Sequence, residues 1–295
     1  MPVRVPDSCE VMSISSGSSG SSRHLPDRRF LVLCAFAGVL GLIAVIVAVS
    51  WFSPFGQSEA APPAPLPAGA AAVPAVDMSA LPESTTHTTI DAAPQDPGPV
   101  VPTDGDVVHP RKQVPVFTAP GGSAIARIGP RQVGDTWLPV IDEQPGWVQV
   151  LLPSRPNGSA GWLPSDALDR ARTPYLVRVH LRSLSMELLD NGRLLGEWTI
   201  GIGKKSAPTP VGRTFLLGSF SDRKQNYSPV ILPLGSHSPT LDSFGGGPGT
   251  VAIHTWPTDD VFGTRSSDGC IRVPSDALDQ LTEVPLGTLV LVDEQ

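Results

Sequence analysis

The run Ser267-Asp268-Gly269-Cys270-Ile271-Arg272 contains the residue that decides the interpretation of this chain, Cys270. The chain has 295 residues and three cysteines. The other two, Cys9 and Cys34, lie before and inside a long apolar run at residues 30–52. If everything after that run is exported, Cys270 has no intramolecular partner in a compartment where cysteines usually form disulfides. An exported thiol without a partner favours a nucleophile over a structural cysteine.

The apolar run at residues 30–52 predicts a membrane-spanning helix. Its 23 residues include no charge and no proline, and a helix of that length crosses a hydrocarbon core of about 30 Å. Arginines lie just before it, and residues 53–107 contain no Lys or Arg. The positive-inside rule therefore places the N-terminus in the cytoplasm and the C-terminal part on the outside of the membrane. A cleaved signal peptide ending near Ala48-Val49-Ser50 is the alternative, and the length of the run favours an uncleaved, single-pass anchor.

Composition divides the chain into five segments. Ser and Gly dominate the first of them, which predicts a disordered cytoplasmic tail, and Pro, Ala and acidic residues dominate the third, which predicts a semi-stiff linker. Two globular parts come after the linker. The predicted segments are the tail (1–29), a transmembrane helix (30–52), the linker (53–107), a small all-β domain (108–172) and a catalytic domain (173–295).

The first globular part consists of short apolar runs separated by Gly/Pro turns, as in Val114-Pro115-Val116-Phe117, which a Pro-Gly-Gly turn follows. This spacing predicts a small all-β barrel. Its tryptophans, Trp137, Trp147 and Trp162, are expected in the core rather than on a ligand platform. With its closing Gly161-Trp162-Leu163, the part resembles bacterial SH3-like domains, which leaves open whether it binds glycan.

The second globular part also reads as mainly β. Asp190-Asn191-Gly192 between two strand-like runs is a strong hairpin signal. One helix is predicted at residues 275–283, with Ser275 as its N-cap. The hexapeptide Pro-Ser-Asp-Ala-Leu-Asp occurs both at 164–169 and at 274–279, and it predicts the same capped helical turn in both places.

His254 supplies the base that the Cys270 thiol needs. A thiol near its ordinary pKa of about 8.5 is mostly protonated at neutral pH, and it becomes a strong nucleophile when a histidine takes its proton. His254 ends an apolar run sixteen residues before Cys270. Gly269 permits a sharp turn, so the N–H groups of Asp268, Gly269 and Cys270 are expected to converge on a developing oxyanion. A buried structural cysteine beside a core histidine is the competing interpretation, and the spacing of the motif disfavours it.

These residues resemble the L,D-transpeptidase catalytic domain, the YkuD family, over about 120 residues. The cysteine run fits the family's S-x-G-C-hydrophobic-R pattern, and His254 stands at the expected distance upstream. Thr209-Pro210-Val211-Gly212 fits the family's T-P-x-G segment.

Two positions depart from the family pattern. Asp268 stands where many members have His, and Thr255 follows the histidine where many members have Gly. The carboxylate of Asp268 tends to raise the pKa of the Cys270 thiol, unless Arg265 or Arg272 neutralises it.

The resemblance implies an L,D-transpeptidase-type β-sandwich with a short helix, and a reaction. Cys270 attacks the carbonyl between the third and fourth residues of a peptidoglycan tetrapeptide stem, and a D-alanine leaves. A side-chain amine of a neighbouring stem then resolves the thioester, which gives a 3→3 cross-link. The family also implies that the Thr255 carbonyl faces the second nitrogen of the histidine, and that Ser267 and Arg272 support the cysteine loop. It further implies inhibition by carbapenems and no cofactor.

Other functions stay open beside this one. With water as the acceptor, the enzyme would be an L,D-carboxypeptidase, and an amidase of the same fold is a second enzymatic alternative. A non-catalytic, membrane-tethered wall-binding protein is the third, and only the departures at Asp268 and Thr255 support it. The net charge of −7 lies mostly in the linker, and no basic stripe follows it, so nucleic acid is not an expected partner. No His/Cys/Asp cluster has metal-ligand spacing. His237 is interpreted as a surface-loop residue, and Gly203-Lys204-Lys205-Ser206 as a solvated turn.

Overall fold

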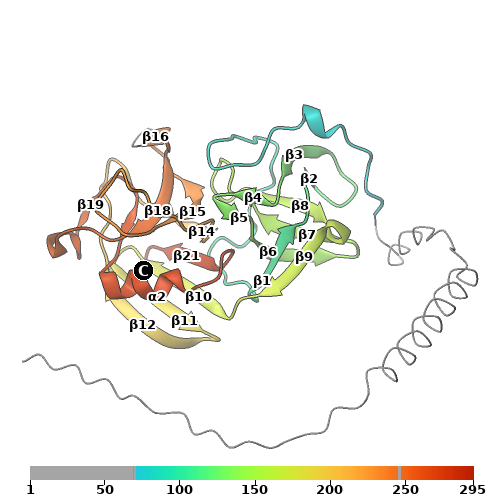
Figure 1. Cartoon of the computed structure of the whole chain (residues 1–295). Coiled ribbons are helices and arrows are strands. Elements are labelled where there is room, and N and C mark those ends of the chain that lie inside the picture. Colours follow the sequence, from blue (N-terminus) through green and yellow to red (C-terminus); the bar gives the residue numbers. More distant parts are fainter. Residues whose placement is uncertain (1–68, 70, 245–246) are drawn as a thin grey trace, which may run out of the picture. The chain divides into compact units, whose positions relative to one another are not determined.

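The computed structural model describes residue 69, residues 71–244 and residues 247–295 (Figure 1). The predicted cytoplasmic tail (1–29) and transmembrane helix (30–52) lie outside the described residues. Among the residues that are described, no helix is long and apolar enough to cross a membrane. The described residues belong to one compact unit, which includes both globular parts.

The described chain is mainly β-strand, with one short α-helix and three 3-10 helices. In chain order, the elements are η1 (Met78–Ala80), β1 (Asp106–Pro110), β2 (Val114–Phe117), β3 (Ala124–Ile128), β4 (Arg131–Gln132), β5 (Gly134–Asp135), β6 (Leu138–Gln144), β7 (Trp147–Leu151), β8 (Ala160–Pro164), η2 (Ser165–Ala167), β9 (Leu168–Arg172), β10 (Tyr175–His180), β11 (Ser185–Asp190), β12 (Arg193–Thr199), β13 (Ile202–Gly203), β14 (Gly212–Phe215), β15 (Ile231–His237), β16 (Ser243–Phe244), β17 (Gly247–Pro248), β18 (Thr250–His254), η3 (Asp259–Val261), β19 (Arg265–Ser267), β20 (Ile271–Arg272), α2 (Ser275–Thr282) and β21 (Leu289–Asp293).

The first globular part is a seven-stranded sheet in the order β3-β2-β8-β7-β6-β1-β9. The pairing is antiparallel throughout. Trp147 and Trp162 are buried with Phe117 in a small aromatic cluster, as the sequence predicted, while Trp137 is half-buried against His109. No ladder joins β3 to β9 among the described residues, so the SH3-like barrel that the sequence suggested is not found as a closed barrel.

An ordered segment covers the free edge of β3. This segment, residues 71–105, is called the strap. The backbone N–H of Ser84 donates to the Arg127 carbonyl at 2.9 Å, and the Arg127 N–H donates to the Pro82 carbonyl at 2.9 Å. The Arg127 guanidinium adds bonds to the Met78 and Leu81 carbonyls. Strap residues therefore take the backbone groups that an edge strand would otherwise expose.

The strap replaces most of the free linker that was predicted at 53–107. Ile90 and Ala93 are buried in the core of the first part, and the Trp147 indole donates to the Ala71 carbonyl at 2.9 Å. Composition predicted a solvated spacer because Pro and Ala dominate the segment. The segment nevertheless packs on the sheet, because it buries a few apolar residues and its backbone forms hydrogen bonds with an edge strand and with loops.

The second globular part contains a five-stranded sheet in the order β12-β11-β10-β21-β14 and a three-stranded sheet in the order β15-β18-β20. The predicted hairpin joins β11 to β12, and Asn191 and Gly192 have φ of 48° and 79°. Positive φ at both central residues is what a tight type I′ turn requires. The three-stranded sheet matters most for function, because β18 ends at His254 and β20 begins just after Cys270.

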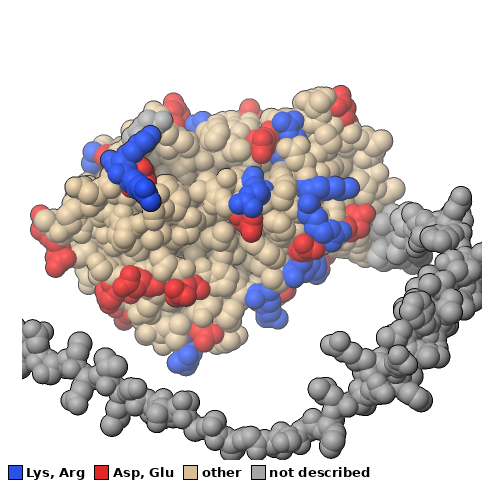
Figure 2. All heavy atoms as spheres, in the orientation of Figure 1, with Lys and Arg blue, Asp and Glu red and all other residues tan. Residues whose placement is uncertain are grey.

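The α-helix packs its apolar face on the second core and turns its acidic face to solvent. Ala277, Leu278 and Leu281 are buried, and α2 lies over the sheet that contains β10, β11 and β12 (Figure 1). In Figure 2, a cluster of acidic side chains lies where Figure 1 places this helix, and the exposed side of the helix includes Asp276 and Asp279. Pro274 rather than the predicted Ser275 is the N-cap, and its side chain makes no capping bond.

The two globular parts share a hydrophobic core. Phe215, Leu217 and Leu289 of the second part belong to the buried cluster that fills the first part. The Thr173 and Thr288 hydroxyls are hydrogen-bonded at 2.8 Å in the buried junction, and Arg213 of β14 forms a buried ion pair with Asp96 of the strap. The boundary predicted near residue 172 is therefore a change of sheet rather than a flexible hinge.

Candidate active site

The cysteine loop connects β19 to β20 and has one strained backbone position. Gly269 has a φ of 114°, a conformation that residues with a side chain rarely adopt. A Cβ at Gly269 would meet no atom closer than 3.7 Å, so backbone conformation rather than space requires glycine here. Cys270 follows directly as a partly buried free thiol.

Hydrogen bonds within the loop and from a neighbouring segment hold its shape. The Ser267 hydroxyl donates to the Cys270 carbonyl at 2.6 Å, and the Gly269 N–H donates to the Ser267 Oγ at 3.2 Å. Thr209, in the T-P-x-G segment, accepts from the Gly203 N–H at 3.0 Å and donates to the Gly269 carbonyl at 2.9 Å. The Gly269 N–H, which was predicted to face the oxyanion, is therefore engaged by Ser267. Within the described part of the chain, the N–H groups of Asp268 and Cys270 have no hydrogen-bond acceptor.

β18 and β20 bring His254 beside the cysteine loop. The two strands pair in parallel, with Ile253 opposite Ile271 and His254 opposite Arg272. The His254 Nδ1 lies 2.6 Å from the Thr255 carbonyl. Because a carbonyl oxygen only accepts, Nδ1 carries the proton and Nε2 presents a lone pair.

An aromatic layer that the sequence analysis did not identify covers the histidine. The Tyr227 ring lies 4.9 Å from the His254 ring and 5.5 Å from the Trp256 ring, centre to centre. The Arg272 guanidinium lies 3.8 Å from the centre of the Trp256 ring. Tyr227 is far from His254 in sequence and belongs to no motif, so no sequence signal could have placed it here.

Thr255, the first departure from the family pattern, anchors this layer. Its hydroxyl donates to the Tyr227 carbonyl at 3.0 Å, and its N–H donates to the Ser228 hydroxyl at 3.1 Å. A glycine would lack the hydroxyl. In this chain the threonine therefore ties the segment that contains Tyr227 to the strand end that contains His254.

Lys204 neutralises Asp268, the second departure. The Lys204 ammonium lies 2.6 Å from the Asp268 carboxylate, and both side chains are partly exposed. Arg265 and Arg272 were the candidates for this role in the sequence, and Lys204 takes it from a turn in which it stays exposed. Arg265 instead donates to the Leu181 carbonyl. The backbone of Lys204 donates to the Ser267 carbonyl at 2.9 Å, which brings its side chain to the loop.

The surroundings of Cys270 and His254 favour the neutral form of both side chains. Burial above all, with a smaller contribution from the Arg272 charge, lowers the pKa of His254 to about 4, against the opposing effect of the bond to Thr255. Burial raises the pKa of the Cys270 thiol, the backbone of Ala252 and the charge of Arg272 lower it, and Asp268 raises it. At neutral pH the pair is therefore a thiol and a neutral imidazole rather than a thiolate and an imidazolium.

We expect opposite effects from removing each partner of the Lys204–Asp268 pair. Lys204→Gln leaves the Asp268 carboxylate uncompensated, so the pKa of Cys270 rises and alkylation by iodoacetamide near pH 7 slows. Asp268→Asn should speed it. Each change should be about two- to fivefold, because exposed ion pairs contribute little. The measurement is the alkylation rate against pH, with Lys205→Gln as the matched control. Superimposable curves for all variants would show that Asp268 is electrostatically silent.

The comparison with protein families identifies the domain that contains this site. The family model YkuD, described as the L,D-transpeptidase catalytic domain, matches residues 174–292. Residues 174–292 are therefore similar to this domain, and this part of the chain is called the YkuD domain below. The match covers less than half of the chain, and no curated protein matches the chain.

Several solved structures are similar to the chain at low sequence identity. One is Bd1075 of Bdellovibrio bacteriovorus, at 22% identity and a TM-score of 0.33, covering 42% of this chain and 49% of that one. An L,D-transpeptidase from Mycobacterium smegmatis has 14% identity and a TM-score of 0.33, covering 53% and 99%. L,D-transpeptidase 3 from Mycobacterium tuberculosis, with a faropenem-derived adduct, has 13% identity and a TM-score of 0.34, covering 47% and 75%. The present chain thus covers about half the length of Bd1075. These similarities carry no conclusion about its function.

A cavity of about 550 Å³ lies at the junction of the YkuD domain and the first part. Its walls include Thr209, Pro239 and Arg265 of the YkuD domain, and Asn157 of the first part. The Thr209 hydroxyl is the one that holds the Gly269 carbonyl, so the cavity adjoins the cysteine loop. His237, predicted on the surface, is buried at the end of β15 beside this junction.

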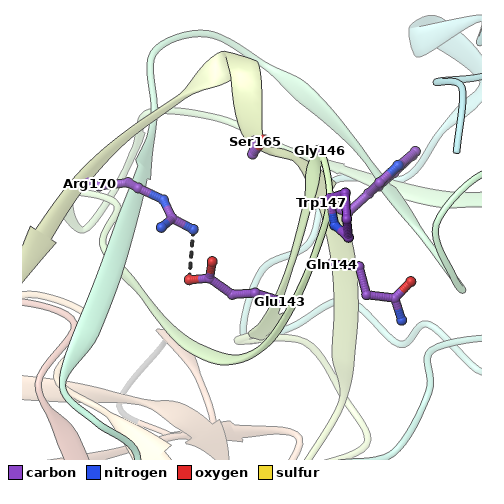
Figure 3. A pocket seen from close by; sticks show the side chains of 7 residues that line it. Glu143, Gln144, Gly146, Trp147, Ser165 and Arg170 are labelled. Atoms are coloured by element: carbon purple, nitrogen blue, oxygen red, sulfur yellow. Dashed lines mark ion pairs between the residues drawn. The ribbon is translucent and has the colours of Figure 1, made fainter. Parts of the chain in front are cut away.

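A second cavity, of about 530 Å³, lies within the first part, at the turn between β6 and β7 (Figure 3). The figure shows Glu143 and Arg170 facing one another, and they form an ion pair at 2.7 Å. Trp147 contributes to the wall but is almost wholly buried. With its charges paired and its tryptophan in the core, this cavity presents no reactive group.

Proposed function

We propose that this chain is a cysteine-dependent L,D-transpeptidase that acts on peptidoglycan tetrapeptide stems and forms 3→3 cross-links through a thioester. One observation supports the proposal above all others. Within a YkuD domain, Cys270 lies in a tight loop beside a strand that ends in His254, and the Nδ1 of that histidine is held by a backbone carbonyl.

In the first step, His254 acts as a general base. Its low pKa keeps the imidazole neutral at pH 7, so Nε2 can take the proton as the Cys270 sulfur attacks the carbonyl carbon between the third and fourth residues of the stem. The sulfur–carbon bond forms and the carbonyl π electrons move to oxygen. The imidazolium then gives its proton to the leaving D-alanine nitrogen as the amide bond breaks. The product is a thioester on Cys270.

The oxyanion of this step needs hydrogen-bond donors that are already in place. The N–H groups of Asp268 and Cys270 are the ones that the loop leaves without an acceptor in the described part of the chain. Ser267 and Thr209 support them indirectly, because both hold the loop by its backbone. Arg272 contributes a positive charge near the thiol, which favours the sulfur anion as it develops.

In the second step, an amine of a neighbouring stem attacks the thioester, and Cys270 leaves as a thiol after His254 has moved the proton. Water in the same place would make the enzyme an L,D-carboxypeptidase. The non-catalytic alternative rested on Asp268 and Thr255. Both residues have contacts at the site, Asp268 with Lys204 and Thr255 with the Tyr227 segment, which favours the catalytic function over this alternative.

We also propose that the enzyme is anchored in the bacterial cytoplasmic membrane, with the YkuD domain in the cell envelope near its stem-peptide substrates. The argument is the uncharged run at residues 30–52 and the arginines that precede it. N-terminal sequencing of the protein from the membrane fraction tests it, since a chain that begins near Trp51 would be a cleaved and secreted enzyme.

The function is tested with the purified chain and synthetic tetrapeptide stems. We expect release of D-alanine and a cross-linked dimer of stems, both detected by mass spectrometry. Release of D-alanine without the dimer would identify a carboxypeptidase. No D-alanine release and no covalent adduct with a carbapenem would contradict the proposed chemistry.

A further inference from the structure

The loop between β7 and β8 in the first part holds a turn of the YkuD domain at two points. The Asn157 side chain donates to the His237 carbonyl at 2.7 Å and accepts from the His237 N–H at 2.8 Å. Two residues earlier, the Arg155 guanidinium lies 2.8 Å from the Asp242 carboxylate. The turn between these anchors, residues 238–242, comes directly after β15.

The same turn reaches the cysteine loop. The Ser238 hydroxyl lies 4.0 Å from the position that a Cβ at Gly269 would take. That hydroxyl accepts from the N–H groups of Thr240 and Leu241 at 3.3 and 3.2 Å, so it organises the turn from within. Pro239 is a wall of the cavity that also contains Thr209 and Arg265. The turn thus forms one side of the cavity next to the cysteine loop, which it approaches at Gly269.

The two anchors differ in strength. The carboxylate of Asp242 is almost fully exposed, and an ion pair of that kind contributes little. Asn157 is half-buried, and it pairs both backbone groups of a residue that is 1% exposed. A buried backbone group that loses its partner is costly, so Asn157 is the stronger of the two anchors from the first part. Within the YkuD domain, Gly249 adds two backbone bonds, from the Ser238 N–H at 2.7 Å and to the Asp242 carbonyl at 3.0 Å.

We propose that Asn157 is a positioning residue for the transpeptidase reaction. It fixes the start of the turn at residues 238–242 from outside the YkuD domain, and thereby shapes the cavity next to the cysteine loop, in which part of the stem peptide lies during the reaction. This inference rests on the proposed function. It means that the first part of the chain completes the substrate site, and that residues 174–292 alone form an incomplete one.

The test compares Asn157→Ala with the wild-type full chain in three measurements. Amide hydrogen exchange at residues 238–242 should become faster, because the anchor is gone. The kcat/KM for a synthetic tetrapeptide stem should fall about tenfold, mainly through KM, as expected for losing one or two hydrogen bonds. Alkylation of Cys270 by iodoacetamide should not change, because so small a reagent needs no cavity.

Two further variants make the result specific. Asn157→Gln keeps the amide but moves it one methylene away, so it should behave like Asn157→Ala. Gln144→Ala removes an exposed amide from a different turn of the first part and should change nothing. A rise in KM without faster exchange would overturn the inference, because Asn157 would then act only by touching the substrate. Unchanged exchange and unchanged KM would also overturn it.

The inference and the proposed function fail in different ways. If the wild-type chain turned over no stem peptide, the proposed function would be defeated. The exchange and alkylation measurements need no substrate, and they would still decide whether Asn157 holds the turn without disturbing the nucleophile.

Discussion

Replacing Cys270 with alanine should abolish D-alanine release, cross-linking and carbapenem adduct formation. The sulfur is the atom that forms the covalent bond, and no other group in the described site can replace it. The expected loss is at least about 10⁴-fold, the order seen when a catalytic nucleophile is removed. Turnover of tetrapeptide stems and intact-mass analysis after carbapenem treatment both measure it.

The control for this variant removes the two other thiols instead. Cys9→Ala combined with Cys34→Ala should keep full turnover and the adduct, because both residues lie in the N-terminal part of the sequence, away from the YkuD domain. Circular dichroism should show the same β-rich spectrum for every variant. Substantial turnover by Cys270→Ala would refute the mechanism.

The second large effect is expected at His254. His254→Ala should slow acylation by about 10²- to 10⁴-fold, the usual contribution of a general base. The loss should be greatest at neutral pH and shrink at alkaline pH, where solvent can deprotonate the Cys270 thiol. His87→Ala is the matched control, because the His87 side chain is exposed. Equal rates for His254→Ala and wild type at pH 7 would assign the base to another group.

The pH dependence of the wild type depends on the same residue. Because the pKa of His254 is about 4, the base stays neutral through pH 5–6, where an ordinary histidine with a pKa of about 6.5 would protonate. Acylation should therefore fall only as the pH drops towards about 4. An NMR titration of the imidazole protons measures the midpoint directly, and a midpoint near 6.5 would contradict the buried, neutral base.

The low pKa of His254 also makes stability depend on pH. The unfolded chain binds a proton at this residue below about pH 6.5 and the folded chain does so only below about 4. The stabilising contribution of the neutral imidazole is therefore complete above pH 6.5 and is lost as the pH falls towards 4.

Local signals in the sequence were enough to predict the hairpin and to propose Cys270 and His254 as the reactive residues. Asn191-Gly192 requires positive φ and has it, because the constraint lies within two residues. Cys270 and His254 could be proposed because the cysteine run and the distance to the histidine resemble the pattern of the YkuD family. The β-rich character of both globular parts likewise results from apolar runs between Gly/Pro turns.

The partners that complete the site come from distant segments, and only the tertiary structure brings them together. Lys204 meets Asp268 because β13 pairs with β19. Tyr227, in the segment before β15, meets His254 at the end of β18, and Asn157 reaches His237 from the other globular part. None of these contacts has a spacing that a sequence pattern could show. The packing of the strap could not be predicted for the same reason, because the strand edge and loops that hold it are distant in sequence.

The repeated hexapeptide shows most directly what the sequence determines and what it leaves to the fold. Pro-Ser-Asp-Ala-Leu-Asp begins a 3-10 turn and then enters strand β9 at residues 164–169, but it begins the α-helix at residues 274–279. In both copies the sequence determines that the chain turns after the proline. The element that forms beyond this turn depends on the neighbouring structure. The first copy continues into β9, which pairs with the edge of β1. The second copy packs on an apolar surface, where Ala277, Leu278 and Leu281 are buried. Short-range propensity is worth only a few tenths of a kcal/mol per residue, so strand pairing and burial, which need distant residues, decide the outcome.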